Sequence, residues 1–184
     1  MNINIRNPDK TLEVFRNLHV NDKKEHAFTV DEQGFVTSYV HGMAHSVMVA
    51  GRRGEMVYHN HPSGGAFSDA DLISTALTAA KGIVASGKSG DYILQKGNHF
   101  KANAFVKAVN NAHLKGKDYD DAVDRWLKAN AKKYDYKYEF RKCQDELKTY
   151  RGGRNVEGDE NENQEKLGII LLATIITVTN MVSL

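Results

Sequence analysis

The 184-residue chain is 41% hydrophobic and 26% charged, with a mean hydropathy of −0.53, which indicates a soluble globular protein. Its formal net charge of +2 is too balanced to indicate a nucleic-acid-binding protein. The single cysteine, Cys143, excludes an internal disulfide and a cysteine-only zinc site. No apolar stretch follows the first residues, so we expect no secretory signal peptide and a cytoplasmic protein.

The first part of the chain predicts one helix and several short strands. Pro8 lies where a helix begins, and apolar residues between Leu12 and Leu18 give that helix one apolar side. Four short strands are then predicted, at 26–31, 35–40, 46–49 and 55–59. The turn-like residues 32–34 suggest that the first two strands form a β-hairpin.

The following part is predicted to be mainly helical. A helix is expected from Asp69 to about Ser86 because its apolar residues share one face, and a strand is expected at 91–96. Two more helices show apolar spacing of i, i+3, i+4 and i+7, at 102–109 and 119–127. This order of elements predicts an α+β or α/β fold with a helical C-terminal extension.

The charge is unevenly distributed along the chain. Residues 1–100 carry ten basic and ten acidic groups, whereas residues 101–154 carry fourteen basic and eight acidic groups. Residues 155–166 carry one basic and five acidic groups, as a solvated linker would. We therefore predict a domain at 1–100, a basic helical extension at 101–154, an acidic linker at 155–166 and a hydrophobic tail at 167–184.

The tail, residues 167–184, reads LGIILLATIITVTNMVSL and carries no charge. As a helix it would be about 27 Å long, close to the roughly 30 Å of a membrane's hydrocarbon core. Its many β-branched residues would suit a buried strand equally well. Two alternatives stay open: membrane association through this tail, and a C-terminus packed on the domain.

One segment, HNHPSGGAFSDAD from His59 to Asp71, carries the residues of a metal site. His59 and His61 lie at i and i+2 at the end of a predicted strand, so both side chains point to the same side. Pro62 ends the strand, and the two glycines that follow allow a sharp turn that returns Asp71 to the histidines. Two imidazoles and one carboxylate, with a fourth position left to water, are typical of catalytic zinc sites.

Some of these residues, and the other histidines of the chain, also have interpretations that involve no metal. Ser68 and Asp71 also form a capping-box pattern at a helix start, which is compatible with a metal role for Asp71. We expect the remaining isolated histidines to be ordinary surface residues, namely His19, His99 and His113. His41 and His45 are four residues apart, but their setting shows no helical pattern that would favour a metal site.

The segment resembles the metal-binding motif of the JAMM/MPN (JAB) zinc metalloprotease family, whose pattern is HxHP, a short loop and SxxD. The HNHPSG segment is similar to the corresponding segment of bacterial RadC-like proteins and of JAB-type domains in phage and toxin systems. The resemblance covers roughly residues 10–100. The loop of six residues between His61 and Ser68 is one residue shorter than is usual in the family. A mixed, cytidine deaminase-like sheet flanked by helices is the fold that the resemblance implies.

The resemblance also implies the roles of individual residues. His59, His61 and Asp71 would hold Zn²⁺, Ser68 would stabilise the tetrahedral intermediate, and a glutamate on an earlier strand would act through the zinc-bound water. Glu25, which directly precedes the strand at 26–31, matches that placement, with Glu55 as the alternative.

The expected function is therefore that of a zinc-dependent hydrolase that cleaves peptide or isopeptide bonds. Zinc lowers the pKa of bound water toward ~7, and a carboxylate can carry the proton to the leaving amine. A peptide or protein is the expected substrate, with a ubiquitin-like tail or a polyprotein among the candidates.

Two other functions remain as alternatives. One is a catalytically silent JAMM-like scaffold in a phage or toxin system, with the basic region at 101–154 docking an acidic partner. The other is a RadC-like association with DNA through lysines interleaved with Tyr134, Tyr136 and Tyr138. We favour packed aromatics and a solvated basic face over nucleic-acid binding.

Overall fold

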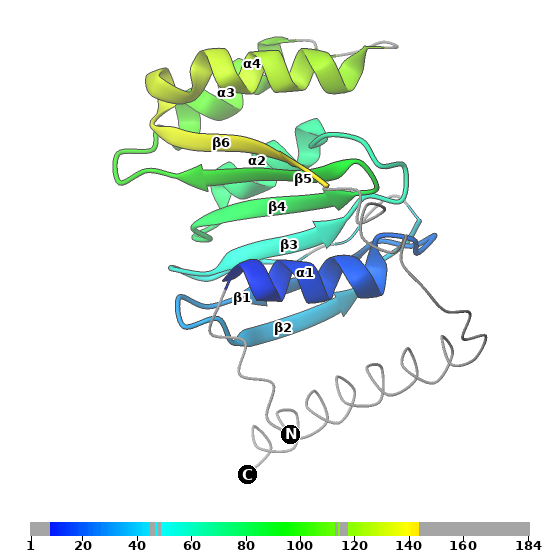
Figure 1. Ribbon diagram of the computed structural model, residues 1–184. Helices are drawn as coiled ribbons and strands as arrows, with labels where there is room; N and C mark the ends of the chain where they lie inside the picture. The colour runs from blue at the N-terminus through cyan, green and yellow to red at the C-terminus, as the bar shows by residue number, and fades with distance from the viewer. Residues whose placement is uncertain (1–7, 45–46, 48, 113, 115–117, 144–184) are drawn as a thin grey trace, which may run out of the picture. The chain divides into compact units, whose positions relative to one another are not determined.

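The structure is a computed structural model and describes residues 8–44, 47, 49–112, 114 and 118–143 (Figure 1). The elements in chain order are α1 (Pro8–His19), β1 (His26–Val30), β2 (Val36–His41), β3 (Met56–Asn60), α2 (Asp69–Leu77), β4 (Gly82–Gly87), β5 (Gly90–Lys96), α3 (Ala102–Ala112), α4 (Tyr119–Tyr134) and β6 (Tyr136–Lys142). The strands form one mixed sheet in the order β2-β1-β3-β4-β5-β6, in which β3 and β4 run parallel and the other neighbours antiparallel. This combination of helices with a mixed sheet confirms the α+β class.

The predicted β-hairpin is present as β1 and β2. The carboxylate of Asp31 accepts hydrogen bonds from the backbone N–H groups of Gln33 and Phe35 and so closes the turn. Gly34 has a φ of 87°, a conformation that glycine adopts without steric cost. The local turn chemistry therefore specifies the hairpin, as the sequence predicts.

The two faces of the sheet are covered by different helices, with α1 in front and α2 behind in Figure 1. Under α1, Leu12 and Phe15 pack on Phe28 of β1 and Tyr58 of β3. The opposite face packs against α2, α3 and α4 in a larger core that includes Leu72, Phe105, Val123 and Leu127. β3 and β4 are thus buried on both faces, and the site lies where β3 ends.

The predicted helix from Asp69 to Ser86 is wrong in its second half. Helix α2 ends at Leu77, and residues 82–87 form β4, in which all six residues are buried. The pairing of β4 with β5 requires glycine at residue 82, because a Cβ atom there would lie 2.2 Å from the carbonyl oxygen of Leu94 on β5. A strand buried on both faces is apolar throughout, so its residues also fit the apolar face of a helix.

The helical prediction is also wrong for residues 136–142, which form β6 and pair with β5. The predicted boundary at residue 100 therefore divides a single sheet, and the described residues belong to one compact unit. Tyr134 and Tyr136 are buried in its core, and Tyr138 donates a hydrogen bond to Asp124. These tyrosines pack within the protein and are not presented for stacking on bases.

Three sequence predictions fall wholly or partly outside the described residues. In the predicted strand at 46–49, residues 46 and 48 are not described, and residues 47 and 49 belong to no strand. The linker at 155–166 and the tail at 167–184 lie outside as well. Among the helices of the described part, none combines the length and apolar character needed to cross a membrane.

Candidate metal centre

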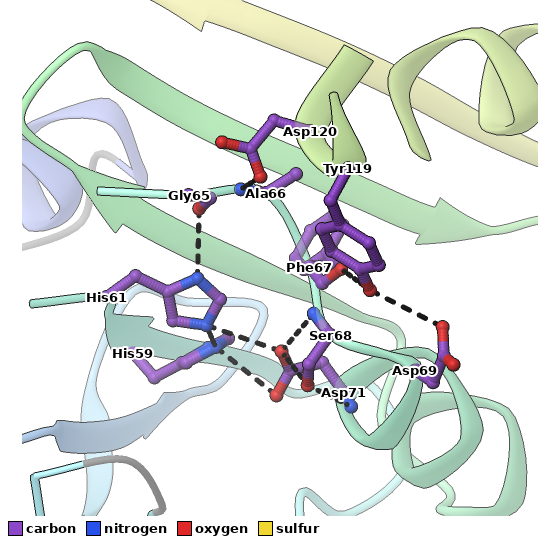
Figure 2. A network of polar contacts seen from close by, with 10 residues as sticks. All are labelled: His59, His61, Gly65, Ala66, Phe67, Ser68, Asp69, Asp71, Tyr119 and Asp120. Atoms are coloured by element: carbon purple, nitrogen blue, oxygen red, sulfur yellow. Dashed lines mark hydrogen bonds and ion pairs between the residues drawn. The ribbon is translucent and has the colours of Figure 1, made fainter. Parts of the chain in front are cut away.

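The two histidines of the motif lie at the end of β3, between β1 and β4. His59 pairs with Ala27 of β1 and Ala85 of β4, and it is only 2% exposed. The alternation of an extended backbone directs His59 and His61 to the same face of the sheet, and their Nε2 atoms lie 2.7 Å apart (Figure 2).

Asp71 reaches these histidines from the first turn of α2. Gly64, with a φ of 77°, turns the chain after the strand, and Ser68 caps the helix. The Oδ1 atom of Asp71 lies 3.4 Å from Nε2 of His59, and its Oδ2 atom lies 3.3 Å from Nε2 of His61. The structure thus brings together the three residues that the sequence selects, with their ligand atoms all within 4.8 Å of one another.

The capping box is present and shares the Asp71 carboxylate with the histidines. The Asp71 N–H donates to Ser68 Oγ, while the Ser68 backbone N–H and hydroxyl both donate to Asp71 Oδ2, at 2.8 and 2.7 Å. The capping box expected from the SxxD pattern is therefore confirmed, and it leaves Asp71 beside both histidines. The cap occupies Oδ2, and Oδ1 faces His59.

A backbone carbonyl orients the ring of His61. The Nδ1 atom of His61 lies 2.9 Å from the carbonyl oxygen of Gly65, which can only accept, so the ring hydrogen lies on Nδ1. Nε2 of the neutral ring then presents its lone pair to His59 and Asp71, as a metal ligand requires. His59 differs, because its buried Nδ1 has no hydrogen-bond partner among the described residues.

Two residues of α4 hold the loop between Pro62 and Ser68, and the sequence analysis did not identify them. The Asp120 carboxylate accepts a hydrogen bond from the N–H of Ala66 at 2.8 Å, and the Tyr119 hydroxyl donates to the carbonyl of Phe67 at 3.0 Å (Figure 2). Burial, followed by the charge of Asp69, raises the pKa of Tyr119 and keeps the hydroxyl protonated. No local signal marks these residues, because they lie about fifty positions after the loop.

The pKa values of His61 and Asp71 depart from their ordinary values in opposite directions. Burial lowers the pKa of His61, but the hydrogen bond to Asp71, the charge of Asp71 and smaller contributions from Gly65 and Glu25 outweigh it, so the pKa is raised overall. Burial raises the pKa of Asp71, but the two histidines hold it well below its ordinary value. Asp71 is thus a carboxylate at neutral pH, and only neutral imidazoles with a carboxylate can bind a cation.

The donor set fits a divalent transition metal. Ligand atoms that form bonds of ~2.0–2.1 Å in a tetrahedral site lie about 3.3 Å from one another. The distance from Nε2 of His59 to Oδ1 of Asp71, 3.4 Å, matches this spacing, whereas Nε2 of His61 lies 3.3 Å from the other carboxylate oxygen, Oδ2. The histidine nitrogens, at 2.7 Å, are closer than this and would have to separate by about 0.6 Å.

Of the two candidate glutamates, the structure places Glu25 at the site. Glu25 lines the same pocket as His59, His61, Ser68 and Asp71, a cavity of about 800 Å³. Its backbone is held by two hydrogen bonds to residues 42 and 43 beyond the end of β2. Glu55 precedes β3 at the opposite end, about 13 Å from His59 by the rise of a strand, and its carboxylate accepts a hydrogen bond from the N–H of Arg52.

The chain matched no model of a known protein family, no curated protein and no solved structure.

Proposed function

We propose that this protein is a zinc-dependent hydrolase that cleaves peptide or isopeptide bonds through a metal-activated water. The observation that carries the proposal is the convergence of His59, His61 and Asp71 on the wall of an open pocket that Glu25 and Ser68 also line. The resemblance of the HNHPSG and SxxD segments to JAMM-type metalloproteases, stated above, supports the same chemistry.

The metal ligands would be His59 Nε2, His61 Nε2 and Asp71 Oδ1. When bound there, a zinc ion supplies Lewis-acid chemistry and lowers the pKa of a bound water toward ~7. His61 and the capped carboxylate of Asp71 hold their positions before substrate arrives, because each has a second hydrogen-bond partner.

Glu25 would serve as the general base and then as the general acid. A carboxylate beside the attacking water accepts its proton and delivers it to the amine that leaves. Glu25 is suited to this role because it shares the pocket with the proposed ligands and its charge acts on His61. No ligand atom of Glu25 belongs to the cluster of His59, His61 and Asp71, so the two tasks fall to different residues.

Ser68 would stabilise the oxyanion that develops on the scissile carbonyl. Its hydroxyl now donates to Asp71 Oδ2 at 2.7 Å, and it would have to turn from that oxygen to the substrate. The backbone N–H of Ser68 also donates to Oδ2, so this oxygen keeps a partner when the hydroxyl turns away.

The pocket continues from the polar cluster along apolar side chains, among them Val47, Val57 and Ile83. A polar end that carries the reactive groups and an apolar wall beside it suit a peptide chain, whose backbone is polar and whose side chains are often apolar. The substrate class of the proposal is therefore a peptide or protein.

Metal content and hydrolysis, measured on the same full-length preparations, test the proposal. The double variant His59→Ala/Asp71→Ala should contain one zinc fewer per chain than the wild type and should have no hydrolytic activity. Glu25→Gln should keep the wild-type zinc content and lose roughly 10²- to 10⁴-fold in rate. His99→Ala, at an exposed position outside the pocket, is the matched control and should change neither quantity.

The substrates for this test are a fluorogenic peptide library and peptides branched through a lysine ε-amine, with zinc as the added metal. A double variant that keeps the wild-type zinc content would overturn the metal assignment. Zinc bound at the site without hydrolysis of either substrate set would instead favour the catalytically silent scaffold.

A further inference from the structure

A second group of histidines lies at the junction of α1 and β1, on the face of the sheet opposite the pocket. It consists of His19 at the end of α1, His26 at the start of β1, and Asp22 in the loop between them; we call it the His19 cluster. The expectation that His19 is an ordinary surface residue is wrong, since it is only 9% exposed.

The His19 cluster brings together three side chains that could hold a metal ion. Oδ2 of Asp22 lies 2.9 Å from Nδ1 of His19 and 3.1 Å from Nε2 of His26, and the three ligand atoms lie within 4.8 Å of one another. The two imidazole rings stack with centroids 4.3 Å apart, so both direct a nitrogen at the same carboxylate oxygen. Separations near 3 Å are close to the spacing of ligands around one zinc ion.

The nitrogens that point away from Asp22 share one partner, the hydroxyl of Tyr39. This oxygen lies 3.1 Å from Nε2 of His19 and 3.0 Å from Nδ1 of His26. The Nδ1 atom of His41, which pairs with His26 across the hairpin, lies 3.1 Å from the same nitrogen of His26. A side chain that binds the outer nitrogen of a ligating histidine is typical of metal centres.

The positions of the hydrogens favour a cation over a metal-free network. If both neutral rings donate to Asp22, Tyr39 can donate to only one outer nitrogen, and its contact with the other joins two lone pairs. If a cation instead binds the two nitrogens that face Asp22, the ring hydrogens lie on the two nitrogens that face Tyr39. The Tyr39 oxygen then accepts a hydrogen bond from each of them.

We propose that His19, Asp22 and His26 form a second, structural site for a divalent transition metal of the zinc class. The ligands are Nδ1 of His19, a carboxylate oxygen of Asp22 and Nε2 of His26, with Tyr39 holding both rings from outside. The Asp22 side chain is 43% exposed, so solvent reaches the remaining coordination position.

This site would brace the segment that presents Glu25 to the pocket. Asn60, whose side chain points away from its neighbours His59 and His61, donates to the carbonyls of His19 and Lys24 and accepts from the N–H of His26. Glu25 lies between two of these anchored residues. A cation held by His19, Asp22 and His26 would close the same loop through its side chains. The two sites are therefore linked through the backbone of residues 19–26, but each has its own ligands.

Zinc binding to the full-length protein tests this inference. Zinc per chain is measured by mass spectrometry after gel filtration, together with the thermal midpoint before and after chelation. Asp22→Asn and His26→Gln should each contain one zinc fewer than the wild type, whereas the exposed control His99→Gln should contain the wild-type number. Added zinc should raise the midpoint of the chelated His59→Ala/Asp71→Ala protein by roughly 5 °C or more, and Asp22→Asn added to that background should remove the rise.

A further variant separates a metal role from a merely structural one. Tyr39→Phe removes the shared acceptor without removing a ligand, and it should weaken zinc binding about 10- to 100-fold. The inference is overturned if Asp22→Asn and His26→Gln both keep the wild-type zinc content. Failure of the proposed hydrolase site gives the opposite pattern, in which His59→Ala/Asp71→Ala keeps all the zinc and Asp22→Asn loses it.

Discussion

The buried side chain of Asn60 should control the stability of the loop that carries Glu25. Asn60 is fully buried and makes three hydrogen bonds, to the His19 carbonyl at 2.9 Å, the Lys24 carbonyl at 3.0 Å and the His26 N–H at 2.6 Å. Asn60→Ala removes all three; the His19 carbonyl keeps the N–H of Asp22 as a donor, whereas the Lys24 carbonyl and the His26 N–H lose the Asn60 partner. At ~1 kcal/mol for each bond, the free energy of unfolding should fall by about 3 kcal/mol.

Urea unfolding of the chelated protein measures this change directly, without a contribution from metal binding. With a denaturant dependence of roughly 2 kcal/mol per molar urea, the midpoint should fall by ~1.5 M. Asn110→Ala, an exposed asparagine on α3, is the matched control and should shift the midpoint by no more than ~0.3 M. If Asn60→Ala shifts the midpoint no more than this control does, the loop is held by something other than the Asn60 side chain.

Two further predictions concern the candidate metal centre. Ser68→Ala removes the helix cap and the hydroxyl bound to Asp71, so the free energy of unfolding, measured with urea, should fall by ~1 kcal/mol. Zinc affinity at this site, measured by chelator competition, should fall about 10- to 100-fold. The control Ser68→Thr should retain most of both, and an unchanged affinity in Ser68→Ala would contradict the role of the hydroxyl. In chelated protein, protonated His61 stabilises the fold at pH values below 6.5, and this stabilisation is lost as the pH rises through the raised pKa of His61, whereas ionised Asp71 stabilises the fold at pH values above 3.8. The difference in thermal midpoint between wild type and His61→Gln should therefore be larger at about pH 5 than at about pH 8. An equal difference at both pH values would contradict the coupling of the two side chains.

The features that depend on neighbouring residues can be predicted from the sequence. The capping pattern of Ser68 and Asp71 and the hairpin turn at Asp31–Gly34 are made by groups within a few positions of one another. The i and i+2 spacing of His59 and His61 likewise sets their common direction once the segment is extended. Each of these can be derived from backbone geometry and hydrogen-bond chemistry alone.

The features that depend on contacts between distant parts of the chain follow only from the assembled fold. Residues 82–87 become a strand because β3 and β5 lie on both sides of them, although their apolar pattern also fits a helix. Glu25 and not Glu55 reaches the pocket because β1 and β3 are antiparallel neighbours, which brings the start of β1 beside the end of β3. Tyr39 joins His19 and His26 only through the hairpin and the packing of α1. Local spacing carries no information about such contacts, since they arise only when the sheet and its covering helices assemble.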